Sequence, residues 1–216
     1  MKDGFFVTGT GTDVGKTFVS ALLVKTLRKR GVNAGYFKPA LSGAYRREGT
    51  LVPGDAEEVC RASGLPGPPE RYVAYLYERA VSPHLAARLE NRPIEQEQIM
   101  ERFRLISEEF DCVVAEGCGG LFCPMRTDGK TLLLGDVAAM LGLPLVIVSP
   151  SGLGAINAAV LAVEYAAKLE LPVRAIVLNG FEAGNDLHED NRVQIERFTG
   201  LRTICVARDA QTIDLP

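Results

Sequence analysis

This sequence of 216 residues has few cysteines, no excess of positive charge and no long uninterrupted apolar run. The five cysteines form no Cys-x-x-Cys pair and are odd in number, which favours reduced thiols in a cytoplasmic protein over a disulfide framework. The net charge of −3, without a basic stripe or an aromatic platform, predicts neither a nucleic-acid partner nor a membrane surface. The most apolar segment, 143–163, is interrupted by Ser-Pro-Ser-Gly at 149–152, so it predicts a strand, a loop and a helix rather than a membrane span.

The sequence also predicts neither a targeting segment nor a linker between domains. A strand is predicted at 5–8, directly after Met-Lys-Asp-Gly, which leaves no room for a signal peptide and predicts a cytoplasmic location. We find no linker, internal repeat or low-complexity segment. Apolar residues make up 47% and charged residues 24%, as in ordinary globular proteins. Residues 1–216 are therefore expected to form a single domain.

Short apolar strands alternate with helical patterns along the chain. Further strands are predicted at about 34–38 (ending at Pro39), 112–116, 145–149, 173–179 and 202–206, with an edge strand at 72–77. Helices are predicted at 15–30, from Asp55, from Ser82-Pro83 and at about 95–109, and a polar loop at 44–54. The alternation predicts an α/β fold: one doubly wound, mostly parallel sheet with helices on both faces. Ligands bind at the carboxyl ends of the strands of such sheets.

Residues 5–17, Phe-Phe-Val-Thr-Gly-Thr-Gly-Thr-Asp-Val-Gly-Lys-Thr, predict a buried strand, a glycine-rich turn and the start of a helix. Such a turn directs backbone N–H groups at one spot, where a phosphate is stabilised. Lys16 adds a positive charge for the outer phosphates, and the Thr17 hydroxyl is placed to ligate Mg²⁺. The segment predicts a nucleoside triphosphate site and a P-loop NTPase type of fold. Five residues separate the first glycine from Gly-Lys-Thr, so either Thr10 takes the first glycine position or the loop is one residue longer.

Polar side chains follow the carboxyl ends of several predicted strands. The second strand gives Lys38 and Ser42, the loop after it gives Asp55, and the strand Cys-Val-Val-Ala ends on Glu116. With Thr17, the two carboxylates form a set of hard oxygen ligands suited to Mg²⁺ that bridges phosphates. Taken singly, Lys38 could be a solvated lysine at a strand end, and Asp55 could cap a helix. The Gly-Gly pair at 119–120 could be only a turn. A carboxylate that ends a buried strand is costly without a partner, which favours a functional role.

Other features carry weaker signals. Residues 153–157 open a helix after a strand, so their free N–H groups could hold a carboxylate or merely begin the helix. Asn179 and Gly180 end a strand and could contact a base or form a turn. His84 is expected to be structural, and Asp136 to be a surface or first-turn acid of a helix.

Five short motifs occur in a fixed order: Gly-Thr-Gly-Thr-Asp-Val-Gly-Lys-Thr at 9–17, Phe-Lys-Pro-Ala-Leu-Ser-Gly at 37–43, Gly-Asp-Ala at 54–56, Ser-Pro-His at 82–84 and Ala-Glu-Gly-Cys-Gly-Gly at 115–120. In order and near-matching spacing they resemble the dethiobiotin synthetase family, from the first strand to about Asn179. The family's phosphate loop has the same five-residue spacing. The Lys-Pro-x-x-Ser-Gly and Glu-Gly-x-Gly-Gly motifs are specific, whereas the loop alone marks only the superfamily.

The resemblance implies an ATP-dependent ligase of biotin synthesis. Such an enzyme carboxylates 7,8-diaminononanoate with CO₂, phosphorylates the carbamate and closes the ureido ring, releasing ADP and phosphate. Lys38 and Lys16 are implied to be catalytic, and Thr17, Asp55 and Glu116 to hold Mg²⁺. ATP contacts are implied for Asp13, Val14, Gly15, Lys16, Thr17, Phe18, Asp55, Glu116, Gly117, Cys118, Gly119, Asn179 and Gly180. Substrate contacts are implied for Thr12, Ser42, Gly154, Ala155, Ile156 and Asn157, the last four from the partner subunit of a homodimer.

The sequence departs from the family pattern in two places. Residues 204–208 replace a Gly-x-x-Pro-like segment beside the base, which leaves the choice between ATP and other triphosphates open, and Cys118 replaces the usual alanine. The alternative function is a nucleotide-switch ATPase of the partition or septum-site type. Those proteins carry an extra lysine early in the loop, where this chain has Thr-Gly-Thr at 10–12. A synthetase coupled to a glutaminase would need an attached domain, for which this length leaves no room.

Overall fold

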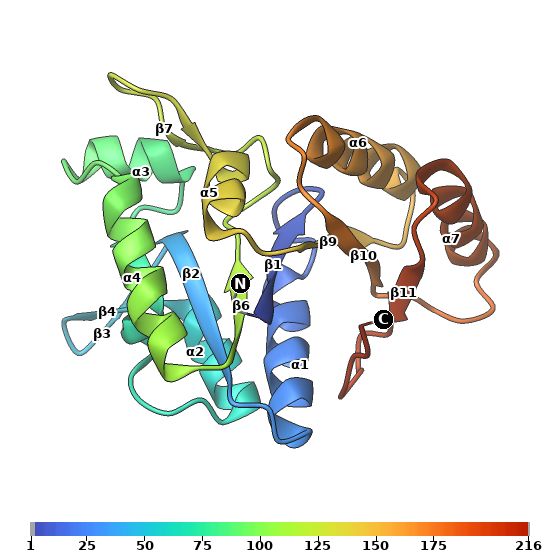
Figure 1. The fold of residues 1–216 in the computed structure, drawn as a ribbon, viewed down its shortest axis with the longest axis horizontal. Helices are drawn as coiled ribbons and strands as arrows, with labels where there is room; N and C mark the ends of the chain where they lie inside the picture. The colour runs from blue at the N-terminus through green and yellow to red at the C-terminus, as the bar shows by residue number, and fades with distance from the viewer. Residues whose placement is uncertain (1–2, 216) are drawn as a thin grey trace.

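Seven parallel strands form the central sheet of the computed structural model, which describes residues 3–215 (Figure 1). In sheet order they are β11 (Thr203–Val206), β10 (Val173–Asn179), β9 (Leu145–Pro150), β1 (Asp3–Gly9), β6 (Cys112–Glu116), β2 (Ala34–Ser42) and β5 (Val73–Tyr77). Each neighbouring pair runs parallel, so all seven carboxyl ends reach the same edge of the sheet. The predicted α/β class is confirmed.

The central strands are continuous buried runs rather than alternating ones. All five residues of β6 are buried, as are the first five of β9, Leu-Val-Ile-Val-Ser. This pattern is typical of parallel strands covered by helices on both faces. It also makes the last residue of β6, Glu116, a carboxylate at the end of a fully apolar strand.

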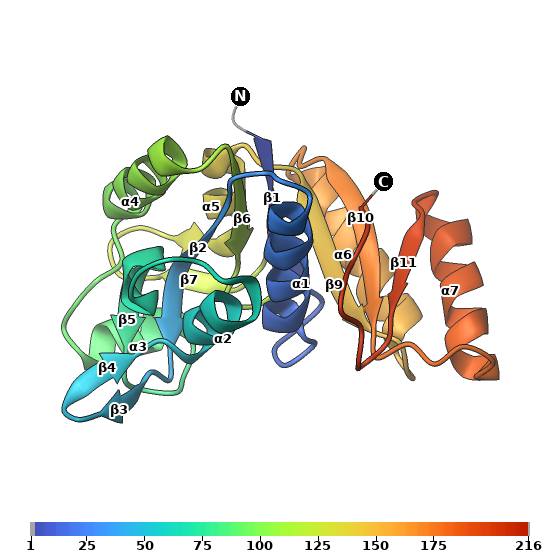
Figure 2. The ribbon, with the colours of Figure 1, turned by 90° about the horizontal axis from the view of Figure 1, so that it is seen from below.

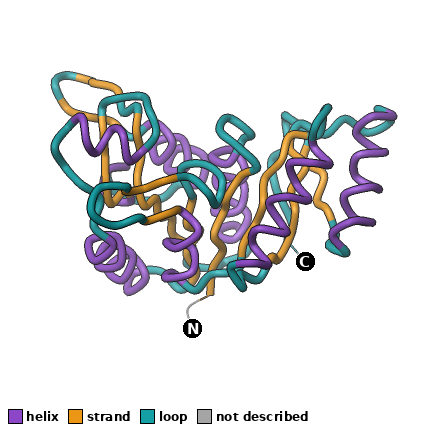
Figure 3. Tube along the Cα trace, turned by 90° about the horizontal axis from the view of Figure 1, so that it is seen from above, coloured by secondary structure: helices purple, strands orange, loops and turns teal. Residues whose placement is uncertain are grey.

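Helices cover both faces of this sheet. They are α1 (Lys16–Lys29), α2 (Gly54–Ser63), α3 (Pro83–Leu89), α4 (Gln96–Glu109), α5 (Leu134–Leu141), α6 (Ala155–Lys168) and α7 (Asp186–Thr199), with a 3-10 turn at Pro69–Tyr72. Helices α1 and α2 pack together on one face, and α4, α5 and α6 lie on the other, with α7 beside α6 (Figures 2 and 3). Among residues 3–215, no helix combines the length and the apolar character that a membrane crossing requires.

The predicted end of the second strand at Pro39 is wrong, because β2 continues to Ser42. Strand β2 pairs with β6 only over residues 34–37 and with β5 over residues 38–42. Pro39 therefore lies where the strand has lost its β6 neighbour, a position at which a missing N–H is tolerated. The longer strand carries both Lys38 and Ser42 to the edge where the strands end.

The polar loop predicted at 44–54 is also wrong. It contains a small antiparallel hairpin, β3 (Tyr45–Arg47) and β4 (Thr50–Val52), held to the body by ion pairs from Arg46 to Glu78 and from Arg47 to Glu57. Because these residues are mostly exposed, their sequence does not alternate between apolar and polar residues as that of a half-buried strand does.

The sequence prediction also lacks α7, the 3-10 turn at Pro69–Tyr72, and the hairpin of β7 (Pro124–Arg126) and β8 (Leu132–Leu133). The predicted helix start at Ser82-Pro83 is confirmed, although the Ser82 side chain makes no capping hydrogen bond. Asp136 is a first-turn acid, as predicted, and its carboxylate accepts a hydrogen bond from the Leu133 N–H at 2.8 Å.

Candidate active site

The loop of residues 10–15 joins β1 to α1 through two left-handed backbone positions. Asp13 has φ of 58° and Gly15 has φ of 94°. A Cβ atom at Gly15 would lie 2.0 Å from the Asn179 side-chain nitrogen, so only glycine fits here. That nitrogen donates a hydrogen bond to the Val14 carbonyl at 3.1 Å. The loop is therefore held by β10 in a shape that leaves the N-terminus of α1 open.

The buried carboxylate of Glu116 is the centre of a polar cluster. Its Oε1 lies 2.6 Å from Lys38 Nζ and accepts a hydrogen bond from the Thr17 hydroxyl at 2.9 Å. Its Oε2 accepts a hydrogen bond from the Tyr36 hydroxyl at 2.8 Å. Lys38 Nζ also lies 2.7 Å from Asp55 Oδ2. A fully buried carboxylate is thus paired and hydrogen-bonded on both oxygens, which offsets its desolvation.

Burial and neighbouring charges shift the pKa values of the two lysines in opposite directions. Burial lowers the pKa of Lys38, but the charges of Glu116 and Asp55 outweigh it and hold the pKa above its ordinary value. Burial, with the nearby charge of Lys38, lowers the pKa of Lys16. Burial and the charge of Glu116 raise the pKa of Tyr36 well above its ordinary value, so its hydroxyl stays a donor. The Lys38 ammonium is therefore stabilised by the two carboxylates that it contacts.

A cavity of about 430 Å³ lies at the carboxyl ends of the strands. Its walls are formed by Thr12, Asp13, Gly15, Lys16, Thr17, Phe18, Lys38, Leu41, Ser42, Asp55, Glu58, Glu116 and Cys118. Four charged residues from four separate segments, 16, 38, 55 and 116, therefore face one space. Sequence reasoning missed Leu41 and Glu58. Leu41 stands inside the Lys-Pro-x-x-Ser motif and Glu58 follows Asp55 by about one helical turn, so spacing alone could have found both.

Some of the predicted contact residues lie outside the cavity wall. They are Val14, Gly117, Gly119, Asn179 and Gly180, together with Gly154, Ala155, Ile156 and Asn157. The Asn179 side chain instead donates its hydrogen bond to the Val14 carbonyl of the phosphate loop. The Gly119 carbonyl accepts a hydrogen bond from the Gly9 N–H at 3.2 Å. The segment 154–157 begins α6, next to the exposed Leu153. Within one chain these four residues do not line this space.

The donor set of the site fits Mg²⁺. Thr17, Asp55 and Glu116 offer one hydroxyl and two carboxylates, all hard oxygen donors. Over the part of the chain that the structure describes, no group of three or more His, Cys, Asp or Glu residues could hold a metal. Mg²⁺ needs no such group, because it is commonly held by one or two carboxylates together with substrate phosphates and water.

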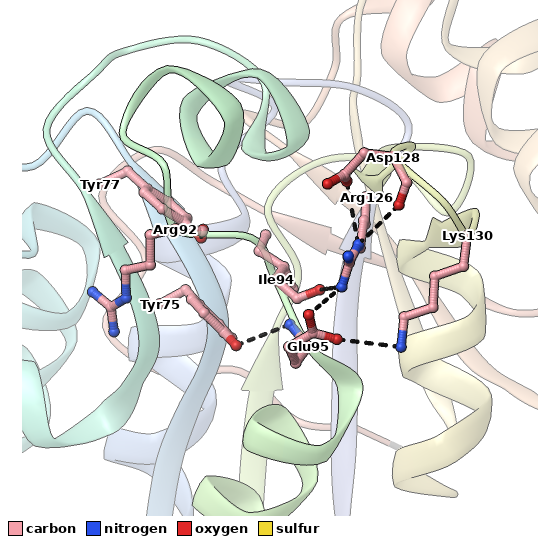
Figure 4. A network of polar contacts seen from close by, with 8 residues as sticks. All are labelled: Tyr75, Tyr77, Arg92, Ile94, Glu95, Arg126, Asp128 and Lys130. Atoms are coloured by element: carbon pink, nitrogen blue, oxygen red, sulfur yellow. Dashed lines mark hydrogen bonds and ion pairs between the residues drawn. The ribbon is translucent and has the colours of Figure 1, made fainter.

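A second polar network anchors the hairpin of β7 and β8 (Figure 4). The Arg126 guanidinium pairs with Glu95 and, at 3.2 Å, with Asp128, and Lys130 lies 3.3 Å from Glu95. Arg126 and His84 line a separate cavity of about 230 Å³. His84 therefore does not line the cavity of Lys38 and Glu116, and the network holds the chain that follows the Glu-Gly-Cys-Gly-Gly segment.

The fold and the loop define a P-loop nucleotide-binding protein. The chain is similar to the signal recognition particle receptor FtsY from Elizabethkingia anophelis, with a TM-score of 0.54 and 12% identity, covering 100% of this chain and 62% of that one. It is also similar to the signal recognition particle 54 kDa protein from Aeropyrum pernix in complex with GDP, with a TM-score of 0.50 and 15% identity, covering 97% and 42%. At these identities the likeness shows the fold alone.

Sequence comparison gives a narrower answer. The family model described as an AAA domain matches residues 3–211. ATP-dependent dethiobiotin synthetase BioD from Clostridium botulinum is 40% identical over 216 residues, covering 100% of this chain and 95% of that protein. The protein of the same name from Clostridium perfringens is 41% identical over 214 residues, covering 99% and 94%. The chain belongs to the dethiobiotin synthetase family, and the nucleotide-switch alternative is not favoured.

Proposed function

We propose that this protein is an ATP-dependent cyclo-ligase that makes dethiobiotin from 7,8-diaminononanoate, CO₂ and ATP. One observation carries the mechanism: the Lys38 ammonium lies between Asp55 and Glu116 in the cavity that also holds Lys16 and Thr17 of the phosphate loop. A cation on β2, level with the end of β6, thus faces the cavity that the phosphate loop borders.

The reaction brings two anions together. One amine of the diamine takes up CO₂ and becomes a carbamate, and a carbamate oxygen then attacks the γ-phosphorus of ATP as ADP leaves. Lys16 and Lys38 stand where they neutralise charge that spreads over the transferred group. The product of this step is a mixed carbamic–phosphoric anhydride. The second amine attacks its carbonyl carbon, phosphate leaves with the bridging oxygen, and the ureido ring closes.

Thr17, Asp55 and Glu116 are proposed to hold Mg²⁺, which supplies further positive charge to the phosphates when it is bound. Supporting this, the Thr17 hydroxyl and Lys38 both approach one oxygen of Glu116, at 2.9 and 2.6 Å. Thr12 and Ser42 lie on the cavity wall and are proposed to contact the carbamate end of the substrate.

The active form is proposed to be a homodimer in which residues 154–157 of the partner subunit bind the distal carboxylate of the substrate. Within one chain this segment lies outside the cavity, and free N–H groups at a helix N-terminus favour an anion. Leu153 is 92% exposed, Leu161 of α6 is also exposed, and so is Phe122, whose ring packs against Tyr165 of α6, so the surface around α6 exposes apolar side chains that a second copy would cover.

Substitution on this surface tests the dimer. Leu161→Asp is expected to shift the molecular mass measured by light scattering from dimer to monomer and to raise the KM for the diamine. Leu105→Asp, an exposed leucine on α4, is the matched control and should leave the mass unchanged. A monomeric wild-type protein with full activity would overturn the proposal.

The chain is further proposed to be one synthetase domain that works in the cytoplasm with ATP as its nucleotide. In support of one domain, the segment after β11 returns to the first helix, where the Ile213 N–H donates to the Thr26 hydroxyl at 3.2 Å and the Ile213 side chain is buried.

Purified protein with ATP, Mg²⁺, bicarbonate and 7,8-diaminononanoate tests the function. Phosphate release is expected to depend on the diamine and to match dethiobiotin formation mole for mole. Hydrolysis that needs no diamine and is stimulated by a protein partner would contradict the ligase assignment.

A further inference from the structure

Helix α2 carries three carboxylates in its first turns, and two of them have charged partners. The carboxylate of Asp55 lies 2.7 Å from the Lys38 ammonium, and Glu57 pairs with Arg47 of the β3–β4 hairpin, also at 2.7 Å. Glu58 lines the cavity of Lys38 and Glu116, and over residues 3–215 its side chain has no ion pair and no hydrogen bond. One negative charge on the cavity wall is thus left to face the space itself.

The pitch of α2 places Glu58 next to Asp55. Residues three apart on a helix lie on the same face, with about 5–6 Å between their Cβ atoms. Glu58 is exposed and also borders a surface hollow together with Glu57 and Arg61. It therefore stands at the rim of the cavity, one helical turn outward from the carboxylate that contacts Lys38.

The proposed substrate brings two amines to this cavity. They are on neighbouring carbons of 7,8-diaminononanoate, so when one takes up CO₂ the other lies in the same part of the space. An alkylamine is protonated at neutral pH. The Lys38 ammonium repels such a cation, and it already engages the carboxylates of Asp55 and Glu116. The second amine therefore needs a different carboxylate as its partner.

Two carboxylates of the cavity wall remain, those of Asp13 and Glu58. Asp13 belongs to the phosphate loop, where its negative charge faces the proposed triphosphate site. Glu58 is on α2, which packs against β2, the strand that carries Lys38 and Ser42. Since Ser42 is proposed to contact the carbamate end of the substrate, Glu58 is the better placed of the two.

On the basis of the proposed function, we propose that Glu58 is a specificity-determining residue that binds the ammonium group of the diamine, on the amine that does not take up CO₂. A carboxylate and an ammonium form a charge-assisted hydrogen bond, which is stronger than a neutral one. This contact selects a diamine over a monoamine of the same chain length. It also keeps the second amine away from the Lys38 ammonium.

Calorimetry on the nucleotide-free protein in CO₂-free buffer tests the contact, with three ligands: 7,8-diaminononanoate, 7-aminononanoate and 8-aminononanoate. Glu58→Gln is expected to weaken binding of the diamine about tenfold, the effect of losing one hydrogen bond to a charged group. One monoamine should lose affinity by the same factor. The other, which lacks the amine that Glu58 binds, should bind Glu58→Gln as it binds the wild type.

Two further variants and a kinetic measurement sharpen this test. Glu57→Gln removes the neighbouring carboxylate, which does not line the cavity, and should bind the diamine as the wild type does. Glu58→Asp keeps the charge and should restore part of the affinity. In the ligase assay, Glu58→Gln should raise the KM for the diamine about tenfold and leave kcat near its wild-type value, because the contact is already made in the ground state.

Equal affinity of wild type and Glu58→Gln for the diamine would overturn the proposal. So would an equal loss with both monoamines, because the general field of the carboxylate would then suffice. A tenfold loss in Asp13→Asn with none in Glu58→Gln would assign the amine to the phosphate loop instead. Wild-type protein that neither binds the diamine nor makes dethiobiotin would contradict the proposed function itself. Wild-type protein that makes dethiobiotin, beside an unaffected Glu58→Gln, would refute only the role of Glu58.

Discussion

Replacing Lys38 with methionine removes the cation at the centre of the site and keeps the length of the side chain. In the wild-type protein this ammonium lies 2.6 Å from Glu116 and 2.7 Å from Asp55, and the Lys38 side chain is only 3% exposed. In Lys38→Met the two carboxylates face each other without it. Glu116 keeps its hydrogen bonds from Tyr36 and Thr17 but loses the only opposite charge that contacts it among residues 3–215.

The expected cost follows from the burial of each partner. Breaking a buried ion pair by removing one member costs about 3–5 kcal/mol. Asp55 is 42% exposed, so solvent screens its part, and the loss in Lys38→Met should be at the lower end, about 3 kcal/mol. Turnover should fall by a factor on the order of 10²–10³, the effect of losing one preorganised group that stabilises developing charge.

Urea unfolding and diamine-dependent phosphate release measure the two effects. Lys130→Met, a half-exposed lysine that pairs with Glu95, is the matched control and should change stability by no more than about 0.5 kcal/mol. Added Mg²⁺ should stabilise Lys38→Met more than the wild type, because it replaces the missing charge. A variant as stable and as active as the wild type would refute this account of the cluster.

Three further outcomes follow from the geometry. Gly15→Ala should abolish measurable ATP binding in calorimetry, because its Cβ would lie 2.0 Å from the Asn179 nitrogen at a φ of 94°; unchanged affinity would show that the loop shape is not required. Tyr36→Phe leaves one oxygen of the buried Glu116 without its donor and should lower the free energy of unfolding by about 1–3 kcal/mol in urea titration, and no loss would mean that water replaces the hydroxyl. Burial and the Lys38 charge lower the pKa of Lys16, so its charge is present below that pKa and lost as pH rises through it. The KM for ATP should therefore rise on the alkaline side, whereas Lys16→Arg, which stays charged, should show no such rise, and parallel profiles would contradict this assignment.

The strands of the sheet were predictable because they are short apolar runs that end in polar or glycine residues. Strand β6 matches its predicted bounds, 112–116, and β10 matches 173–179. The hairpin of β3 and β4 was not predictable, since its residues are mostly exposed and its position depends on ion pairs with distant residues such as Glu78. The end of β2 was misplaced because a proline usually ends a strand. The pairing of β2 with β5 explains why Pro39 does not end this one.

The site was partly predictable for the same reason. Lys38 and Glu116 stand at predicted strand ends, Lys16 and Asp55 follow the first two strands, and parallel strands bring such ends to one edge. The donor to the second oxygen of Glu116 was not predictable. Tyr36 lies inside a buried strand, where an aromatic residue usually indicates core packing, and its hydroxyl reaches the carboxylate, at 2.8 Å, only through the pairing of β2 with β6.

The fate of the carbamate oxygen tests the central claim most directly, that one cavity joins a carbamate to the γ-phosphate of ATP. The protein is given ATP, Mg²⁺, the diamine and bicarbonate labelled with heavy oxygen, and the released phosphate is analysed by mass spectrometry before the label exchanges with water. If the carbamate oxygen attacks phosphorus, each phosphate carries one labelled oxygen and the ureido carbonyl carries another. Phosphate whose new oxygen comes from water instead would mean that ATP is simply hydrolysed, and the account would be contradicted.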